Sequence, residues 1–235
     1  MSKKNADNKM GKKERVKEII RVFDELYPEA CCSLDYRDPL QLLIATQLAA
    51  QCTDARVNIV TKSLFQKYRT VYDFAAADQN ELEQDIKSTG FFRNKAKNII
   101  GAAKMIISDF GGEVPSNMED LLKLPGVGRK TANLVRGDFF GIPGIVVDTH
   151  ASRLSGRIGL TANKDPEKIE YDLMEIVPKE SWTNFCHQLV FHGRAVCMAR
   201  KPDCDSCQIR AFCDFGQKKD SDAGSQEADS KNKAK

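Results

Sequence analysis

The chain has 235 residues and a formal net charge of +3, which is enough length for one large domain or two small domains with proper cores. No apolar stretch approaches the roughly 20 residues of a membrane span, and the basic start is not followed by the apolar run of a secretory signal. We therefore expect a soluble, cytoplasmic protein with no membrane partner, and any nucleic acid must meet a local basic patch rather than a strongly basic surface.

Both ends of the chain have the composition of disordered segments. Residues 1–17 carry seven Lys or Arg against Asp7 and Glu14, and residues 217–235 contain no large hydrophobic residue. We predict a disordered basic arm over 1–17, a disordered tail over 217–235 and a folded region between them.

Apolar residues recur with helical spacing through most of the folded region. Asp38-Pro39 and Asp165-Pro166 each place a capping residue before a first-turn proline, and Ser116–Glu119 has the pattern of a capping box. The only strand-like run, 145–147, is too short for a sheet, so we predict an all-α fold. The residues with helical spacing are Ile19, Phe23, Leu26, Leu40, Leu43, Ile44, Leu48, Val57, Val60, Leu64, Ile169, Leu173 and Ile176.

A glycine-rich turn, Pro125–Gly128, joins two predicted helices of about 117–123 and 129–139 and makes a helix-hairpin-helix. Glycines let the backbone approach a ligand closely, and the N–H groups at a helix start bind anions. The alternative is an ordinary helical hairpin whose glycines only permit the turn. Arg129 and Lys130 favour phosphate binding, because two cations in the first turn oppose the helix dipole unless an anion binds there. The candidate phosphate-binding residues are Gly126, Val127, Gly128 and Arg129.

Two further residues could carry chemistry. A helix start, the neighbouring Arg129 and partial burial would each favour loss of a proton from Lys130, and a neutral lysine attacks electrophilic carbon and forms Schiff bases. Most lysines, however, are solvated surface groups. Asp148 follows the apolar run 145–147 and is expected to cap the next helix. If it also faces a cavity, its carboxylate could stabilise positive charge on a sugar or take a proton.

Four of the eight cysteines crowd together near the end of the folded region, as Cys197-x6-Cys204-x2-Cys207-x5-Cys213. In an intracellular protein, cysteines are more typically metal ligands or buried thiols than disulfides. Four thiolates this close would repel one another unless a metal neutralised them, so the pattern predicts a metal site. The spacing leaves zinc and an iron-sulfur cluster both open, because zinc more often uses two C-x2-C pairs or a Cys/His mixture. The two histidines of the preceding helical stretch are expected to pack or cap.

Several stretches occur in one order along the chain: LLIATQLAAQCTD, GFFRNKAKNI, LPGVGRKTAN, VVDTHASR and the four-cysteine spacing. With them, residues from about 18 to 216 resemble endonuclease III, the bacterial DNA glycosylase and abasic-site lyase of the helix-hairpin-helix superfamily. The resemblance implies a two-lobed helix-hairpin-helix DNA glycosylase fold. A helical barrel lobe would span 32–143, and an iron-sulfur cluster lobe would combine 18–31 with 144–216.

The resemblance also implies an activity in base excision repair. The protein would excise oxidised pyrimidines from double-stranded DNA and cleave abasic sites by β-elimination, as a monomer. The damaged base would be flipped out of the stack, because its sugar carbon cannot be reached inside the duplex. Lys130 would be the nucleophile and Asp148 the essential aspartate. The family's 4Fe-4S cluster would be held by Cys197, Cys204, Cys207 and Cys213.

Other DNA contacts follow from the same resemblance. Gln51, at a break between two helices just before the capping Thr53, would enter the duplex as a polar wedge that fills the hole left by the flipped base. Phe91 stands where the family usually has leucine, and would be either a second wedge or a core aromatic. The basic loop Arg200-Lys201, tied down by the cluster, would meet a backbone phosphate.

Two other functions compete with this interpretation. An adenine-mismatch glycosylase of the same superfamily shares the hairpin, the aspartate and the cluster, but generally lacks the lysine and carries an additional C-terminal domain. A non-catalytic DNA-binding module would use the hairpin and the cluster only as structure. The presence of Lys130 argues against the first alternative, and Lys130 together with Asp148 argues against the second.

Overall fold

The structure of the chain is a computed structural model in which residues 10–218 are described. The predicted disordered ends therefore lie outside the described residues over 1–9 and 219–235. Residues 10–218 form helices and connecting segments, and no strand occurs among them, so the all-α prediction is confirmed. Within the same range, no helix combines the length and the apolar character needed to cross a membrane.

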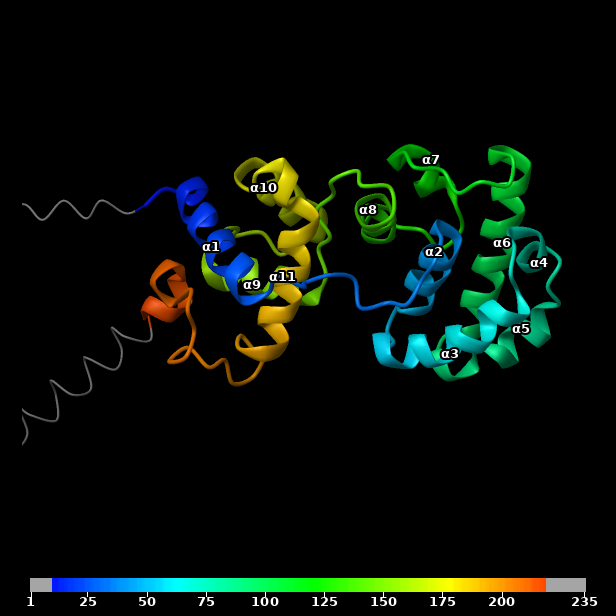
Figure 1. Ribbon diagram of the computed structural model, residues 1–235, viewed down its shortest axis with the longest axis horizontal. Helices are drawn as coiled ribbons and strands as arrows, with labels where there is room; N and C mark the ends of the chain where they lie inside the picture. Colours follow the sequence, from blue (N-terminus) through cyan, green and yellow to red (C-terminus); the bar gives the residue numbers. More distant parts are fainter. Residues whose placement is uncertain (1–9, 219–235) are drawn as a thin grey trace, which may run out of the picture. The chain divides into compact units, whose positions relative to one another are not determined.

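The described chain divides into two compact units, coloured by sequence in Figure 1. Cys31–Val146 forms one of them, which we call the hairpin unit. The other, which we call the cysteine unit, joins the segment up to Ala30 with the segment from Val147 onward. The helices of the hairpin unit are α2 (Pro39–Leu48), α3 (Asp54–Lys67), α4 (Val71–Ala75), α5 (Gln79–Asp85), the 3-10 helix η1 (Lys87–Thr89), α6 (Phe92–Phe110), α7 (Met118–Lys123) and α8 (Arg129–Asp138). The helices of the cysteine unit are α1 (Lys12–Leu26), α9 (Thr149–Ile158), α10 (Pro166–Ile176), the 3-10 helix η2 (Lys179–Ser181), α11 (Trp182–Ala195) and the 3-10 helix η3 (Arg210–Phe212).

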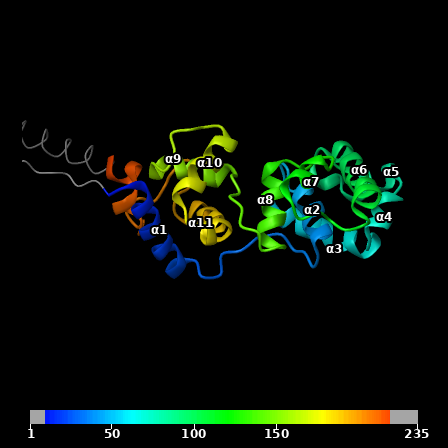
Figure 2. The same cartoon turned by 90° about the horizontal axis from the view of Figure 1, so that it is seen from above.

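Helix α6 is the longest helix of the hairpin unit, and α4 and α5 pack against it (Figures 1 and 2). Its apolar residues recur every three or four positions, and Ala96, Ile99 and Ile106 are almost completely buried. Helix α2 is buried along nearly its whole length, from Leu42 to Leu48, because α3, α6 and α8 all pack on it. The hairpin unit therefore has a core on which α8 and its preceding turn are held.

Helix starts follow the predicted capping signals with one shift. The side chains of Asp38 and Asp165 each accept a hydrogen bond from the backbone N–H three residues on, at 2.8 and 3.0 Å, as predicted. The expected capping box starting at Ser116 is wrong. Asn117 caps α7 instead, because its Oδ1 accepts the Asp120 N–H at 2.8 Å while its Nδ2 donates back to the Asp120 carboxylate at 2.6 Å.

The cysteine unit brings together distant parts of the chain. The side chains of Val16, Ile19 and Phe23 on α1 are fully buried, and α1 packs on α10, α11 and η3. Segments near the two ends of the described chain thus lie side by side, as both views show (Figures 1 and 2).

The predicted disorder extends too far at both boundaries. Helix α1 begins at Lys12, so the prediction is wrong for residues 12–17: Val16 belongs to the buried face, and Arg15 donates to Asp214 Oδ1 at 2.6 Å. The chain is also helical over 214–218, so the prediction is wrong for residues 217 and 218. Local composition could not predict that Arg15 is ordered, because its partner Asp214 lies 199 residues away in the chain.

Candidate active site and cysteine pocket

The turn between α7 and α8 has the predicted hairpin form. Gly126 has a φ of +77°, and a Cβ at this position would lie 2.9 Å from the Asn98 side chain, so the turn requires glycine. Gly128 is the N-cap of α8 and offers no side-chain cap. A Cβ on Gly128 would meet nothing within 4 Å, so open space lies in front of the helix start. An uncapped helix start beside open space is a suitable anion site.

Two contacts fix the hairpin turn. The Val127 N–H donates to the Leu124 carbonyl at 3.1 Å, and the Val127 side chain is buried. Gln47 of α2 donates from Nε2 to the Pro125 carbonyl at 3.3 Å. Val127 therefore shapes the turn, and the phosphate contact predicted for its amide would have to replace the bond to Leu124.

Lys130 is the second residue of α8, and its side chain is exposed. The expected partial burial is therefore wrong: Thr131 and Ala132 of the same turn are buried, but Lys130 is on the exposed side of α8. An exposed amine beside an anion site can reach a ligand whose phosphate binds there.

Asp148 is the N-cap of α9, as predicted. Its Oδ1 accepts the Ala151 N–H at 2.7 Å, and the residue is half-buried. The cap fixes the carboxylate near the start of the cysteine unit's second segment, whereas Lys130 belongs to the hairpin unit.

Gln51 and Phe91 share an unusual backbone conformation. Their φ values are +54° and +49°, and they are the only residues other than glycine with positive φ among residues 10–218. This region is unfavourable for L-residues, and such strain concentrates at functional sites. Gln51 is exposed in the α2–α3 connection, just before Thr53 caps α3, and Phe91 is 64% exposed at the start of α6, which excludes the core alternative. Both residues line one pocket, together with Gly126.

The four C-terminal cysteines line a second pocket. All eight cysteines of the chain are free thiols. Within residues 10–218, no group of three or more His, Cys, Asp or Glu side chains is arranged to hold a metal ion. Burial, together with the nearby thiols of Cys213, Cys197 and Cys204, raises the pKa of Cys207 to about 11. Four cysteines around one pocket, whose thiolates need a compensating positive charge, are a donor set that suits an iron-sulfur cluster as well as zinc.

Two arginines of α9 hold the loop that begins at Cys197. Arg157 donates to the Cys197 Sγ at 3.3 Å and to the carbonyls of the next two residues at 2.8 and 2.7 Å. Arg153 donates from Nη2 to the Cys197 carbonyl at 3.1 Å. The exposed Arg200 and Lys201 follow on the same loop. Neither α9 arginine is predicted from the sequence as a site residue, although their spacing of four residues places them on one helical face.

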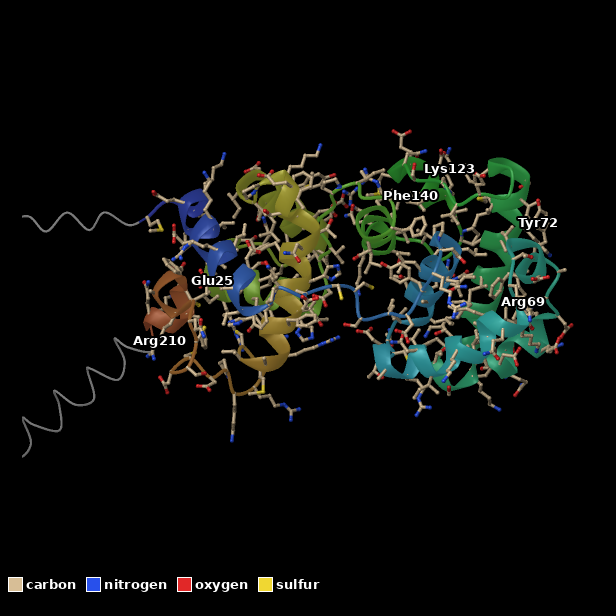
Figure 3. The ribbon with its side chains drawn as sticks, viewed as in Figure 1. Glu25, Arg69, Tyr72, Lys123, Phe140 and Arg210 are labelled. Carbon is tan, nitrogen blue, oxygen red and sulfur yellow. The ribbon has the colours of Figure 1, made fainter. Side chains whose placement is uncertain are left out.

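His192 packs in the cysteine unit, as expected for the histidines of this stretch. It is 1% exposed, its Nδ1 lies 2.9 Å from the Tyr27 hydroxyl, and its Nε2 lies 3.5 Å from the Cys207 Sγ. Burial lowers its pKa to about 4, so the ring is neutral near pH 7. Arg210, labelled in Figure 3 on the segment after Cys207, pairs with Asp205 at 2.8 Å.

Comparison with known proteins identifies the class. The family of HhH-GPD superfamily base excision DNA repair proteins matches residues 44–179, so the chain belongs to that superfamily. Endonuclease III of Synechocystis sp. is 56% identical over 88% of this chain and 94% of its own length. Endonuclease III of Bacillus subtilis is 51% identical over 83% of this chain and 90% of its own length. Within the superfamily, the chain is a member of the endonuclease III family.

A solved structure agrees with this assignment. The structure of a trapped endonuclease III–DNA covalent intermediate, an estranged-adenine complex, matches with a TM-score of 0.85 and 46% identity. The match covers 89% of this chain and 99% of that chain. The helix-hairpin-helix glycosylase fold predicted from the sequence is therefore confirmed.

Proposed function

We propose that this base excision repair glycosylase and abasic-site lyase removes oxidised pyrimidines from double-stranded DNA and cuts the strand through a lysine Schiff base. The observation that carries the proposal is the exposed Lys130 in the first turn of α8, directly behind the hairpin turn, in a chain of the endonuclease III family. We further propose that the protein acts as a monomer in the bacterial cytoplasm, where the chromosome lies.

The chemical step begins with the neutral amine of Lys130. Its lone pair attacks C1′ of a flipped nucleotide, the bond from C1′ to the base breaks, and the base leaves with the bonding electrons and takes a proton. Opening of the sugar ring gives an imine between Nζ and C1′. Loss of a C2′ proton then expels the 3′ phosphate. Asp148 supports the positive charge that develops on the sugar and assists proton transfer.

DNA would be held by its backbone on two surfaces. The uncapped start of α8, with Gly126, Gly128 and Arg129, suits one phosphate, and the exposed Arg200 and Lys201 suit another. Gln51 and Phe91 would fill the space left in the duplex by the flipped base. These contacts position the strand, so that the chemistry falls to Lys130 and Asp148.

The cysteine pocket supports a resident cofactor. We propose that its four cysteines hold a 4Fe-4S cluster, since all four line one pocket and are buried or half-buried. Such a cluster, when bound, would serve as a structural centre for the loop that carries Arg200 and Lys201. The cysteines concerned are Cys197, Cys204, Cys207 and Cys213.

Borohydride trapping tests the assignment of Lys130. The wild-type protein, incubated with an abasic duplex and borohydride, should form a stable protein–DNA adduct, and peptide mapping should place the DNA on Lys130. Lys130→Ala should lose the adduct and strand cleavage but still bind DNA, because Arg129 and the hairpin amides remain. Lys123→Ala, at the exposed end of α7, is the control and should be trapped normally. Trapping by Lys130→Ala at the wild-type level would overturn the assignment.

Asp148→Asn tests the second catalytic residue. The amide oxygen can still accept the Ala151 N–H, so the cap and the fold should persist. Base removal should slow by about tenfold or more, because the negative charge beside the sugar is lost. Single-turnover release of the base measures the effect, and an unchanged rate would remove Asp148 from the mechanism.

Metal analysis tests the cofactor. Protein purified without oxygen should be yellow-brown and contain iron and sulfide in equal amounts, about four of each per chain for one 4Fe-4S cluster. Cys207→Ser should lower the iron content. Cys186 is a buried thiol outside the pocket, so Cys186→Ser is the control and should keep the wild-type iron content. Stoichiometric zinc with little iron would contradict the proposal.

A further inference from the structure

Lys95 is a buried lysine on α6. The residue is only 6% exposed, and its Nζ donates to two backbone carbonyls, those of Leu48 and Thr89, each at 2.8 Å. Lysine is rarely buried to this extent, because the ammonium group loses its hydration. Burial accordingly lowers the pKa of Lys95. The positions of its two carbonyl acceptors give a reason why a charged side chain is buried here despite this penalty.

The two carbonyls belong to the two segments that carry the strained residues. Leu48 is the last residue of α2, three positions before Gln51, and Thr89 is the last residue of η1, two positions before Phe91. The carbonyls at a helix end lack partners within the helix and carry partial negative charge. The ammonium of Lys95 therefore satisfies both and ties the two segments to each other and to α6.

The hydrogen bonds within each of the two segments do not set the distance between them. The Cys52 N–H donates to the Ala49 carbonyl at 3.1 Å, and the Gly90 N–H donates to the Lys87 carbonyl at 3.3 Å, so each segment is closed by bonds within itself. Bonds of this kind set the shape of one loop and do not fix the distance between two loops. The two bonds from Lys95 fix that distance, because they span 47 and 6 positions of the chain and meet at one nitrogen atom.

Left-handed conformations at residues other than glycine persist only where the surroundings determine them strongly. Gln51 and Phe91 both have this conformation, both are exposed, and both line the pocket that Lys95 also lines. A charged donor shared between the two segments is a suitable means of holding both residues at once, because bonds to charged groups are stronger than neutral ones.

We propose that Lys95 is a positioning residue that holds the Gln51 and Phe91 segments at a fixed spacing, so that both side chains enter the duplex as one rigid wedge. The inference rests on the proposed function, which gives Gln51 and Phe91 their wedge roles. Lys95 itself touches no reacting atom. Its role is to make unstacking of the duplex a single event rather than two independent insertions.

The test compares substrates that need a wedge with substrates that do not. Lys95→Met keeps the length and fills the space but donates no hydrogen bond. On an abasic site in duplex DNA, its cleavage rate should fall by about tenfold, because unstacking is no longer offset, while cleavage of an abasic site in single-stranded DNA stays within about twofold. With 2-aminopurine opposite an abasic analogue, saturating wild-type protein should raise the fluorescence, and Lys95→Met should give a smaller rise.

Two further variants separate positioning from folding. Lys104→Met alters an exposed lysine of the same helix and should behave as wild type in both assays. Lys95→Arg keeps a charged donor and should retain more of the duplex activity than Lys95→Met, even if both lose thermal stability. Circular dichroism gives the folded fraction by which each rate is corrected.

The outcomes are distinct. Equal losses on duplex and single-stranded DNA, or a full 2-aminopurine signal in Lys95→Met, would overturn the role of Lys95 while leaving the proposed function intact. A wild-type protein that traps on abasic DNA but gives no 2-aminopurine signal would overturn the wedge and this inference together. A wild-type protein that cannot be trapped would refute the lysine mechanism by a separate measurement.

Discussion

Gly126 and Gly128 occupy one turn but differ in what a side chain would do there. Gly126 has positive φ and sits against Asn98, whereas Gly128 has φ −103° and faces open space. The first glycine is therefore needed by the fold of the turn, and the second leaves room for a ligand. Substitution at the two positions should separate stability from DNA binding.

Gly126→Ala should lower the free energy of unfolding by about 1–3 kcal/mol, through strain at positive φ and contact with Asn98. Gly128→Ala should change it by less than about 0.5 kcal/mol but still weaken binding to an abasic duplex, because its methyl group enters the phosphate space. Urea unfolding and equilibrium binding measure the two effects. Full affinity in folded Gly128→Ala protein would contradict a phosphate site at this turn.

At the residue scale, the sequence was informative where function follows from local position. The N-cap role of Asp148 and the break that contains Gln51 depend on neighbours in the chain, and both predictions are confirmed. The exposure of Lys130 and the contacts of Lys95 and Arg157 depend on elements far away in sequence. The acceptors of the last two are mainly backbone carbonyls, which carry no residue-specific signal.

The connections between helices carry most of the proposed DNA contacts. In the α2–α3 connection, Gln51→Ala should reduce action on a lesion in duplex DNA more than on an abasic site in single-stranded DNA, by about tenfold, since only the duplex must be unpaired. Phe91→Leu, which keeps an apolar side chain, is the comparison and should retain most of its duplex activity. Equal losses on both substrates would place Gln51 in the catalytic pocket.

The loop after α11 should contribute affinity that does not depend on sequence. Lys201→Ala should weaken binding to all duplexes alike and reduce the magnitude of the salt slope by about one unit, the value for one lost phosphate contact. Lys179→Ala, an exposed lysine on η2 of the same unit, is the control. An unchanged slope for Lys201→Ala would show that this loop does not touch the DNA backbone.

At the element scale, the two hairpin helices were predicted to within one residue at each end, α7 at Met118–Lys123 and α8 at Arg129–Asp138, because the glycine turn between them separates two helical stretches. The start of α1 was placed too late, because its first turn is polar and its burial depends on contacts with the far end of the chain. Local signals therefore define helices whose ends are set by neighbouring residues in the chain, and they fail where tertiary contacts supply the stability.

At the scale of the whole molecule, one ion pair joins segments near the two ends of the described chain. Arg15 is 10% exposed in its side chain and pairs with Asp214, whose side chain is 34% exposed. Arg15→Gln should lower the free energy of unfolding by about 2 kcal/mol, because it leaves a partly buried carboxylate unpaired. Arg21→Gln, on the same helix but 65% exposed, should change it by less than about 0.5 kcal/mol. Thermal unfolding of the iron-loaded protein compares the two variants. Equal shifts in melting temperature would show that the Arg15–Asp214 pair contributes no more to stability than the exposed pair of Arg21.

The division of the cysteine unit between two segments has a consequence for synthesis on the ribosome. The hairpin unit is continuous, so all of its contacts are available once residue 146 has emerged. Helix α1 emerges first of all, yet Arg15 meets Asp214 only after 199 further residues, about 10–40 s at bacterial translation rates. Until α10 and α11 emerge, the buried face of α1 has no partner, and the four pocket cysteines emerge later still. The proposed cluster could therefore be completed only after Cys213 has emerged, and products truncated before α10 should expose α1 to chaperones and proteases while retaining the hairpin unit.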